Sequence, residues 1–112
     1  MGRYAQQRKR GSNNGLPLVG SLMPPPAPAF DDEDGHYVQS TNGVGSPGGS
    51  LVLETQDVGG GEWSVYSTVA YQNPYEWGVF GEWEDLWVRV REIGVGANYL
   101  GTSDPSEQLP GS

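Results

Sequence analysis

The sequence predicts an all-β protein, a small antiparallel β-sandwich or barrel that carries a long extended N-terminal arm. Two observations predict the body. Apolar and polar residues alternate in short stretches after His36, which is the pattern of half-buried strands, and glycine-rich turns at 42–49 and 59–61 separate these stretches. The arm is predicted because residues 1–35 show no helical or strand period and contain four prolines between positions 24 and 28.

The β domain is expected over residues 36–104, followed by a polar tail at 105–112. Short strands are predicted at 36–41, 51–56 and 63–71, with the odd-numbered residues from Trp63 to Tyr71 on one face. Between Trp77 and Ile93 the apolar residues change from odd to even positions near 81–85. A regular strand keeps its faces, so two strands or one bulged strand are expected there, with a last short strand at 99–100.

The arm has three predicted parts: a basic tip, an apolar and proline-rich stretch, and an acidic hinge at 31–35. The stretch 16–30 is more apolar than a spacer in water needs to be, so we expect it to contact a neighbouring subunit, although a plain spacer remains the alternative. The expected partner-binding residues of the arm are Leu16, Leu18, Val19, Leu22, Met23 and Phe30. The basic residues that could make an electrostatic contact are Arg3, Arg8, Lys9 and Arg10.

Charge is distributed unevenly along the chain. The sequence has 14 acidic and 6 basic residues and a formal net charge of −8, with four of the basic residues in the first ten positions. A basic tip is therefore joined to an acidic body. Weak contact with nucleic-acid phosphates through this tip is an alternative to a solvated tail, but nucleic acid is not the expected partner.

The acidic hinge is not expected to bind a metal. If Gly35 is aligned with the invariant glycine of a calcium-binding loop, Phe30 and Thr41 occupy the two terminal ligand positions, where carboxylates are needed. We expect instead a solvated hinge, or one that pairs with a basic partner such as the basic tip of another copy.

No catalytic, cofactor-binding or metal-binding residues are predicted. The chain has one histidine and no cysteine, so it lacks a thiolate zinc site and a disulfide framework, and no serine lies in a strained glycine elbow. The carboxylates near aromatic residues are expected to face solvent. We expect a protein that is not an enzyme. No membrane segment is expected either, because no apolar run approaches the roughly 20 residues of a membrane span.

The density of aromatic residues predicts a contact surface. The chain has four tryptophans, more than a small core is expected to hold, so some rings should meet a partner. The expected aromatic contact residues are Trp77, Phe80, Trp83 and Trp87; sugar stacking and internal packing are the alternatives. Arg89 and Arg91 share a strand face and are expected to pair with Glu82, Glu84 or Glu92 or to stack on an aromatic ring.

Residues 62–101, in particular the segments EDLWVRVREI and NYLGTSD, resemble the small immunoglobulin- or fibronectin-like β modules of virion proteins of tailed bacteriophages. The resemblance implies a non-enzymatic structural protein, made in the host cytoplasm, that decorates a capsid or forms part of a tail. It implies major capsid or tail proteins as partners and a homo-oligomeric or symmetric assembly. The alternative function is a carbohydrate- or receptor-binding module that uses exposed tryptophan and tyrosine rings.

Overall fold

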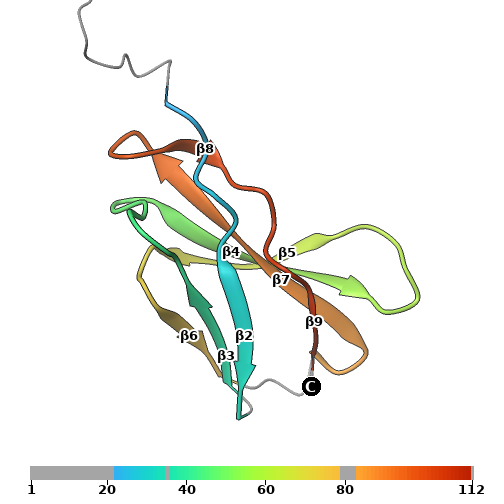
Figure 1. Ribbon diagram of the computed structural model, residues 1–112. Helices are drawn as coiled ribbons and strands as arrows, with labels where there is room; N and C mark the ends of the chain where they lie inside the picture. Colours follow the sequence, from blue (N-terminus) through green and yellow to red (C-terminus); the bar gives the residue numbers. More distant parts are fainter. Residues whose placement is uncertain (1–21, 35, 79–82, 112) are drawn as a thin grey trace, which may run out of the picture.

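The computed structural model describes residues 22–34, 36–78 and 83–111. These residues form eight β-strands and no α-helix, arranged in two packed antiparallel sheets (Figure 1). The all-β fold class is therefore confirmed, and the architecture is a sandwich. Residues 1–21, which include most of the predicted arm, lie outside the described residues.

The smaller sheet has three strands in the order β2-β3-β6. They are β2 (Ala29–Glu33), β3 (His36–Ser40) and β6 (Tyr75–Trp77). β2 and β3 form a hairpin that turns at Asp34, which has a positive φ of 55°. β3 then pairs with β6 so that Tyr37 lies opposite Trp77, which brings two large aromatic side chains to the same face.

The larger sheet has the order β5-β4-β7-β8, and the short strand β9 is also paired to β7. Its strands are β4 (Ser50–Asp57), β5 (Ser64–Ala70), β7 (Leu86–Val95), β8 (Leu100–Thr102) and β9 (Leu109–Pro110). β4 and β7 are paired over their whole common length, from Ser50 opposite Ile93 to Asp57 opposite Leu86. Of the two alternatives predicted for 77–93, two strands or one bulged strand, the first is observed, because β6 and β7 lie in different sheets.

The body begins before the predicted boundary at residue 36. β2 covers most of the expected acidic hinge, and Phe30 within it is 2% exposed and part of the core. Its three acidic residues are exposed, so the strand is held by one apolar side chain and by backbone pairing with β3. Such a strand has little of the composition typical of strands, which is why the sequence pattern did not reveal it.

The body also extends beyond the predicted end at residue 104. Between β8 and β9, the backbone N–H groups of Ser103 and Ser106 donate to the carbonyls of Glu92 and Val90, each at 2.8 Å. The hydroxyls of the same two serines accept from the backbone N–H groups of Glu92 and Val90, each at 2.9 Å. Residues 103–111 therefore pair with the edge of β7 that faces away from β4, and residues 105–111 do not form the expected polar tail.

A bulge in β5 changes the faces of the strand that looked most regular in the sequence. Leu53 of β4 lies opposite Ser67, but Glu54 lies opposite Val65, so Tyr66 is one extra residue on β5. Such an insertion reverses the side-chain alternation beyond it. The prediction of one shared face from Trp63 to Tyr71 is therefore wrong: Val65 is 63% exposed on the outer face of the larger sheet.

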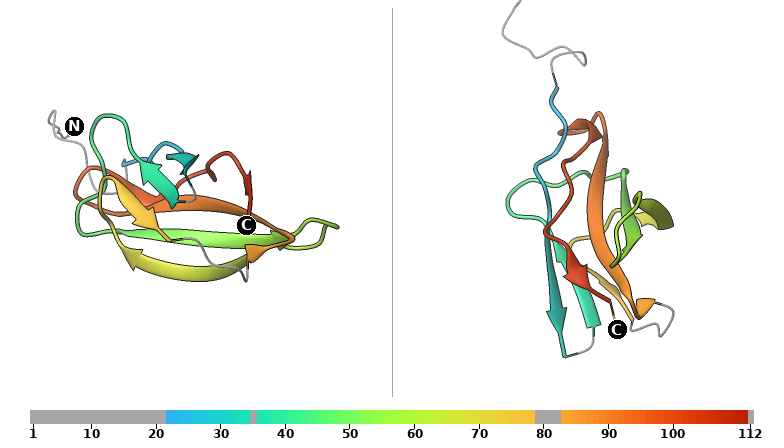
Figure 2. Two further views of the ribbon diagram at one scale, coloured as in Figure 1. Left: turned by 90° about the horizontal axis from the view of Figure 1, so that it is seen from below. Right: turned by 90° about the vertical axis from the view of Figure 1, so that its right-hand side faces the viewer.

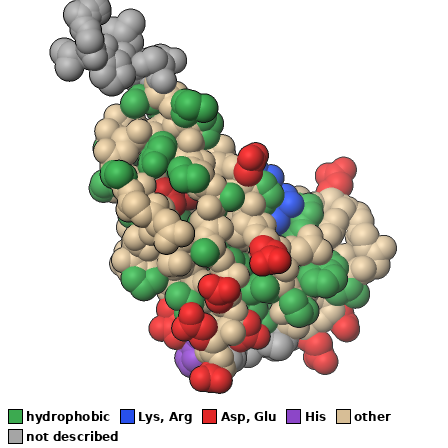
Figure 3. Space-filling view, in the orientation of Figure 1, with side chains coloured by type: hydrophobic (Ala, Val, Ile, Leu, Met, Phe, Trp, Pro, Cys, Tyr) green, Lys and Arg blue, Asp and Glu red, His purple; other side chains and the backbone are tan. Residues whose placement is uncertain are grey.

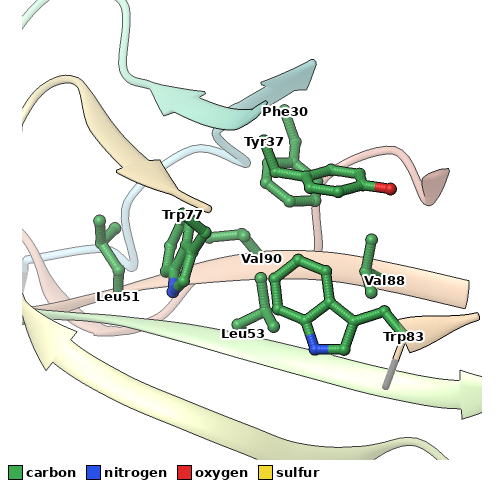
Figure 4. Packing of buried hydrophobic residues seen from close by; sticks show 8 residues of the cluster. All are labelled: Phe30, Tyr37, Leu51, Leu53, Trp77, Trp83, Val88 and Val90. Atoms are coloured by element: carbon green, nitrogen blue, oxygen red, sulfur yellow. The ribbon is translucent and has the colours of Figure 1, made fainter. Parts of the chain in front are cut away.

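The core lies between the two sheets and contains four aromatic rings (Figure 4). The smaller sheet contributes Phe30, Tyr37 and Trp77, and the inward residues of β4 and β7 lie on the other side. Several rings meet edge to face, including Tyr37 and Trp83 with centroids 5.2 Å apart, which is a favoured geometry for aromatic pairs. The buried hydrophobic cluster consists of Phe30, Tyr37, Leu51, Leu53, Trp77, Trp83, Val88 and Val90.

Candidate interaction surface

The outer face of the larger sheet carries an ion-pair cluster centred on Glu54. Glu54 of β4 lies directly opposite Arg89 of β7, and its Oε1 accepts from Nε of Arg89 at 2.7 Å and from Nε of Arg91 at 3.1 Å. The guanidinium of Arg89 also lies 3.9 Å from the ring centroid of Trp63. The bulge in β5 makes this possible, because it brings Trp63 to the outer face.

These contacts partly match the sequence prediction for the two arginines. The expected stacking on an aromatic ring is confirmed by Trp63 and Arg89. The carboxylate partner is different: Glu92 points to the opposite, buried face of β7, Glu84 is exposed, and Glu82 lies outside the described residues. Sequence reasoning missed Glu54 because alternation predicts which side chains of one strand share a face. It does not predict which other strand lies beside that strand.

The aromatic contact surface predicted from the sequence is largely internal. Trp77 is 5% exposed and Trp83 is 0% exposed, so both rings belong to the core and the prediction that they meet a partner is wrong. Trp87 is half-buried on the outer face of β7, opposite Pro110. Phe80 lies outside the described residues. The two sheets hold more rings than expected because aromatic side chains from the smaller sheet pack against one another.

The arm residues predicted to contact a partner fall into three groups. Leu16, Leu18 and Val19, like the basic residues Arg3, Arg8, Lys9 and Arg10, lie outside the described residues. Phe30 is a core residue of its own chain, so its predicted partner contact is wrong. Leu22 is half-buried and Met23 is 72% exposed, which leaves Met23 as the described arm residue most accessible to a neighbour.

Acidic side chains gather at the β2–β3 end of the molecule (Figure 3). The four acidic residues at 31–34 are all exposed, and Nδ1 of His36 lies 2.9 Å from Oε2 of Glu76 in a pair that is more than half exposed. Exposed pairs of this kind contribute little stability. Within residues 22–34, 36–78 and 83–111, no group of three or more histidine, cysteine or acidic residues is arranged to hold a metal ion.

A buried polar network joins β7 to the connection between β3 and β4. Glu92 is 0% exposed on the inward face of β7. Its Oε1 accepts from the hydroxyl of Thr41 at 2.6 Å and its Oε2 accepts from the hydroxyl of Ser46 at 2.5 Å. Nε2 of Gln39 donates to the Thr41 hydroxyl at 2.8 Å. The even positions of Val88, Val90 and Glu92 could have predicted this burial, but a carboxylate rarely occupies a core position.

We expect Glu92→Leu to lower the free energy of unfolding by about 2 kcal/mol, because the buried hydroxyls of Thr41 and Ser46 would lose their acceptor. Glu92→Gln should cost less than about 1 kcal/mol, since the amide can accept from one hydroxyl and donate to the other. Urea denaturation followed by tryptophan fluorescence measures both values. Glu107→Leu, at an exposed position, is the matched control and should have almost no effect. An equal loss in Glu92→Leu and Glu107→Leu would contradict the role of the network.

Comparison with known proteins gives no relative: no protein-family model matches the chain, and no curated protein is similar enough in sequence to be matched to it. The described residues contain no pocket. They also contain no helix long and apolar enough to span a membrane. The class that the fold defines is a small two-sheet β protein, and its function has to be inferred from its surfaces.

Proposed function

We propose that this chain is a structural subunit of a virion, a capsid-decorating or tail component, whose N-terminal segment docks on neighbouring subunits. The observation that carries the proposal is the course of residues 22–28. They run along the body beside β8, where the N–H of Leu100 donates to the carbonyl of Met23 at 3.0 Å (Figure 1). Pro25 and Pro28 are buried against the body, while Met23 remains exposed.

This arrangement supports docking because Met23, near the start of the described residues, is exposed at the surface of the body. The body fixes the position of Met23 by a backbone hydrogen bond, and the sequence has 21 residues before Leu22, which we expect to contact a neighbour. A fully extended chain covers at most about 3.3–3.6 Å per residue. The segment from Arg10 to Leu22 could therefore reach roughly 40 Å, far enough to contact an adjacent subunit.

The separation of charge supports the same proposal. Four of the six basic residues lie within the first ten positions, and all 14 acidic residues follow residue 30. A basic N-terminal segment is attracted to the acidic body of a neighbouring copy, and this attraction is screened by salt. The apolar residues Leu16, Leu18 and Val19 would then add buried contact area.

Removing residues 1–21 tests the proposal. We expect the shortened chain to keep its circular dichroism spectrum and its unfolding midpoint, because none of the eight described strands is removed. We expect it to be lost from gradient-purified particles assembled in a host cell without the full-length chain. Quantitative mass spectrometry of the particles measures its occupancy, and the full-length chain is the reference.

A shortened chain that enters particles at full occupancy would overturn the docking role of residues 1–21. A second variant tests the charge contribution alone: it replaces only Arg3, Arg8, Lys9 and Arg10 with glutamine. We expect it to reduce incorporation in a way that depends on salt. Deletion of residues 1–30 is not a suitable test, because it removes Phe30 from the core together with part of β2.

The alternative of a carbohydrate-binding module has fewer rings to rely on than the sequence suggested. Trp77 and Trp83 are buried in the core, and Trp63 is stacked on Arg89. Trp63 and Trp87 are the two half-buried tryptophans on the outer sheet face. Among the tryptophans, the alternative therefore depends on Trp87 and on a Trp63 ring that already contacts Arg89, and no single observation favours it over docking.

A further inference from the structure

β5 lies at one end of the larger sheet and pairs with a described strand on one side only. The order β5-β4-β7-β8 gives it β4 as its neighbour, and it forms the lower border of the molecule in the left-hand view of Figure 2. The other end of the sheet is different, because the carbonyl of Met23 already accepts a hydrogen bond from the N–H of Leu100 in β8. The edge of interest is the part of β5 beyond the bulge, Ser67–Ala70.

The register identifies the backbone groups at this edge. The N–H of Tyr71 donates to the carbonyl of Gly49 at 3.0 Å. In an antiparallel ladder, hydrogen-bonded and non-hydrogen-bonded pairs alternate, so Val69 and Ser67 also direct their N–H and C=O groups toward β4. Thr68 and Ala70 then direct their N–H and C=O groups away from β4, to the free edge of the sheet. Both residues are exposed.

This edge is complementary to itself. A two-fold axis at Val69 would place Thr68 opposite Ala70 of a second copy and Ala70 opposite its Thr68. Each of these pairs would exchange two hydrogen bonds, so all four outward backbone groups would be satisfied. The side chains at the edge are small, and an extended strand edge with unpaired N–H and C=O groups is a ready template for pairing with another chain.

The self-complementary register selects a second copy as the occupant, and the absence of charge on β5 permits it. The chain carries a net charge of −8, so two bodies repel each other and can meet most readily where charged side chains are absent. Unlike β4 and β7, β5 has no charged residue over its seven positions, and it contains neither lysine nor proline. Natural edge strands usually avoid pairing with other chains because they carry charged residues, especially lysine, or proline.

We propose that β5 pairs antiparallel with β5 of a second copy, with Thr68 opposite Ala70 of that copy, and so joins two larger sheets into one continuous sheet. This pairing rests on the proposed function, the assembly of neighbouring subunits. It adds to that function one specific contact between two copies. It uses the described body alone and does not require residues 1–21.

Complementary charge variants of the full chain test the pairing and its register. In Thr68→Lys/Ala70→Lys, two like-charged pairs would lie directly opposite each other across the two-fold axis, which destabilises strand pairing. The same holds for Thr68→Glu/Ala70→Glu. Sedimentation velocity at about 0.15 M salt, which screens the repulsion between the two acidic bodies, should show a concentration-dependent dimer for the unmodified chain and at least about a tenfold weaker dimer for each variant. An equimolar mixture of the two variants should restore the dimer, because lysine then faces glutamate.

The matched control is Thr102→Lys/Gln108→Lys, which adds the same charge at two exposed positions away from β5 and should dimerise like the unmodified chain. Circular dichroism shows whether each variant is folded. The proposal is overturned if the unmodified chain stays monomeric up to about 1 mM, or if both like-charged variants dimerise as strongly as the control. If a dimer persists in both variants but is lost on removal of residues 1–21, the arm and not β5 forms the contact between the two copies. The docking proposal then stands and the β5 pairing is overturned.

Discussion

Replacing Trp83 with alanine is expected to lower the free energy of unfolding of the body by about 3–5 kcal/mol, the usual cost of removing a large aromatic side chain from a core. Trp83 is 0% exposed and meets Tyr37 and Tyr66 edge to face, with ring centroids 5.2 and 5.5 Å apart. It therefore joins the smaller sheet, through Tyr37, to the bulge of β5. Native proteins have total stabilities of about 5–15 kcal/mol, so the variant should lose a large part of its stability.

Urea denaturation followed by circular dichroism measures the effect of Trp83→Ala. Trp87→Ala is the matched control, because Trp87 is half-buried on the outer face of β7 and loses less apolar contact. We expect the control to cost about 1 kcal/mol, since half of a ring buries correspondingly less apolar area. Similar losses in the two variants would show that Trp83 does not join the two sheets as its packing indicates.

The sequence predicted the strands whose side chains alternate clearly. β3, β4 and β7 lie close to their expected positions. One face of each strand is buried, and the alternation of apolar and polar residues indicates which face it is. The change of parity between Trp83 and Leu86 correctly indicated that β6 and β7 are separate strands. These are local signals, and they need no knowledge of which strand pairs with which.

The strands that escaped prediction are stabilised by pairing rather than by their own composition. β2 buries one apolar residue and three of its residues are acidic, so nothing in its sequence distinguishes it from a solvated hinge. β9 has two residues and is held beside β7 by its register with Trp87 and Val88. Between β8 and β9, serine hydroxyls replace backbone carbonyls as the acceptors for N–H groups of β7, and no periodic pattern signals such an arrangement.

The candidate contact residues were harder to predict than the strands. An excess of tryptophan indicated exposed rings, but which rings are exposed depends on sheet packing, and Trp77 and Trp83 are buried. The bulge at Tyr66 moved Trp63 to the outer face, where it meets Arg89. One inserted residue thus changed the partners of two side chains, and no composition or spacing rule located it.

Shortening the chain after Asp104 is the second change for which we expect a large loss of stability, about 3 kcal/mol or more. It removes the two hydrogen bonds between Ser106 and Val90, and the bonds from Gly111 N–H to the Leu86 carbonyl and from the Tyr37 hydroxyl to the Pro110 carbonyl. Each such bond contributes about 1 kcal/mol. Leu109, which packs against the core, is lost as well.

The shortened chain should also self-associate, because most of the β7 edge that faces away from β4 would then carry unpaired backbone groups in a strand with three valines. Thermal unfolding and light scattering measure the two effects together. Ser106→Ala is the milder variant: it removes only the hydroxyl that accepts from Val90 N–H at 2.9 Å and should cost about 1 kcal/mol. A chain ending at Asp104 that stays monomeric with an unchanged unfolding midpoint would mean that the β7 edge is stable without residues 105–112, and that the body ends where its alternating pattern does.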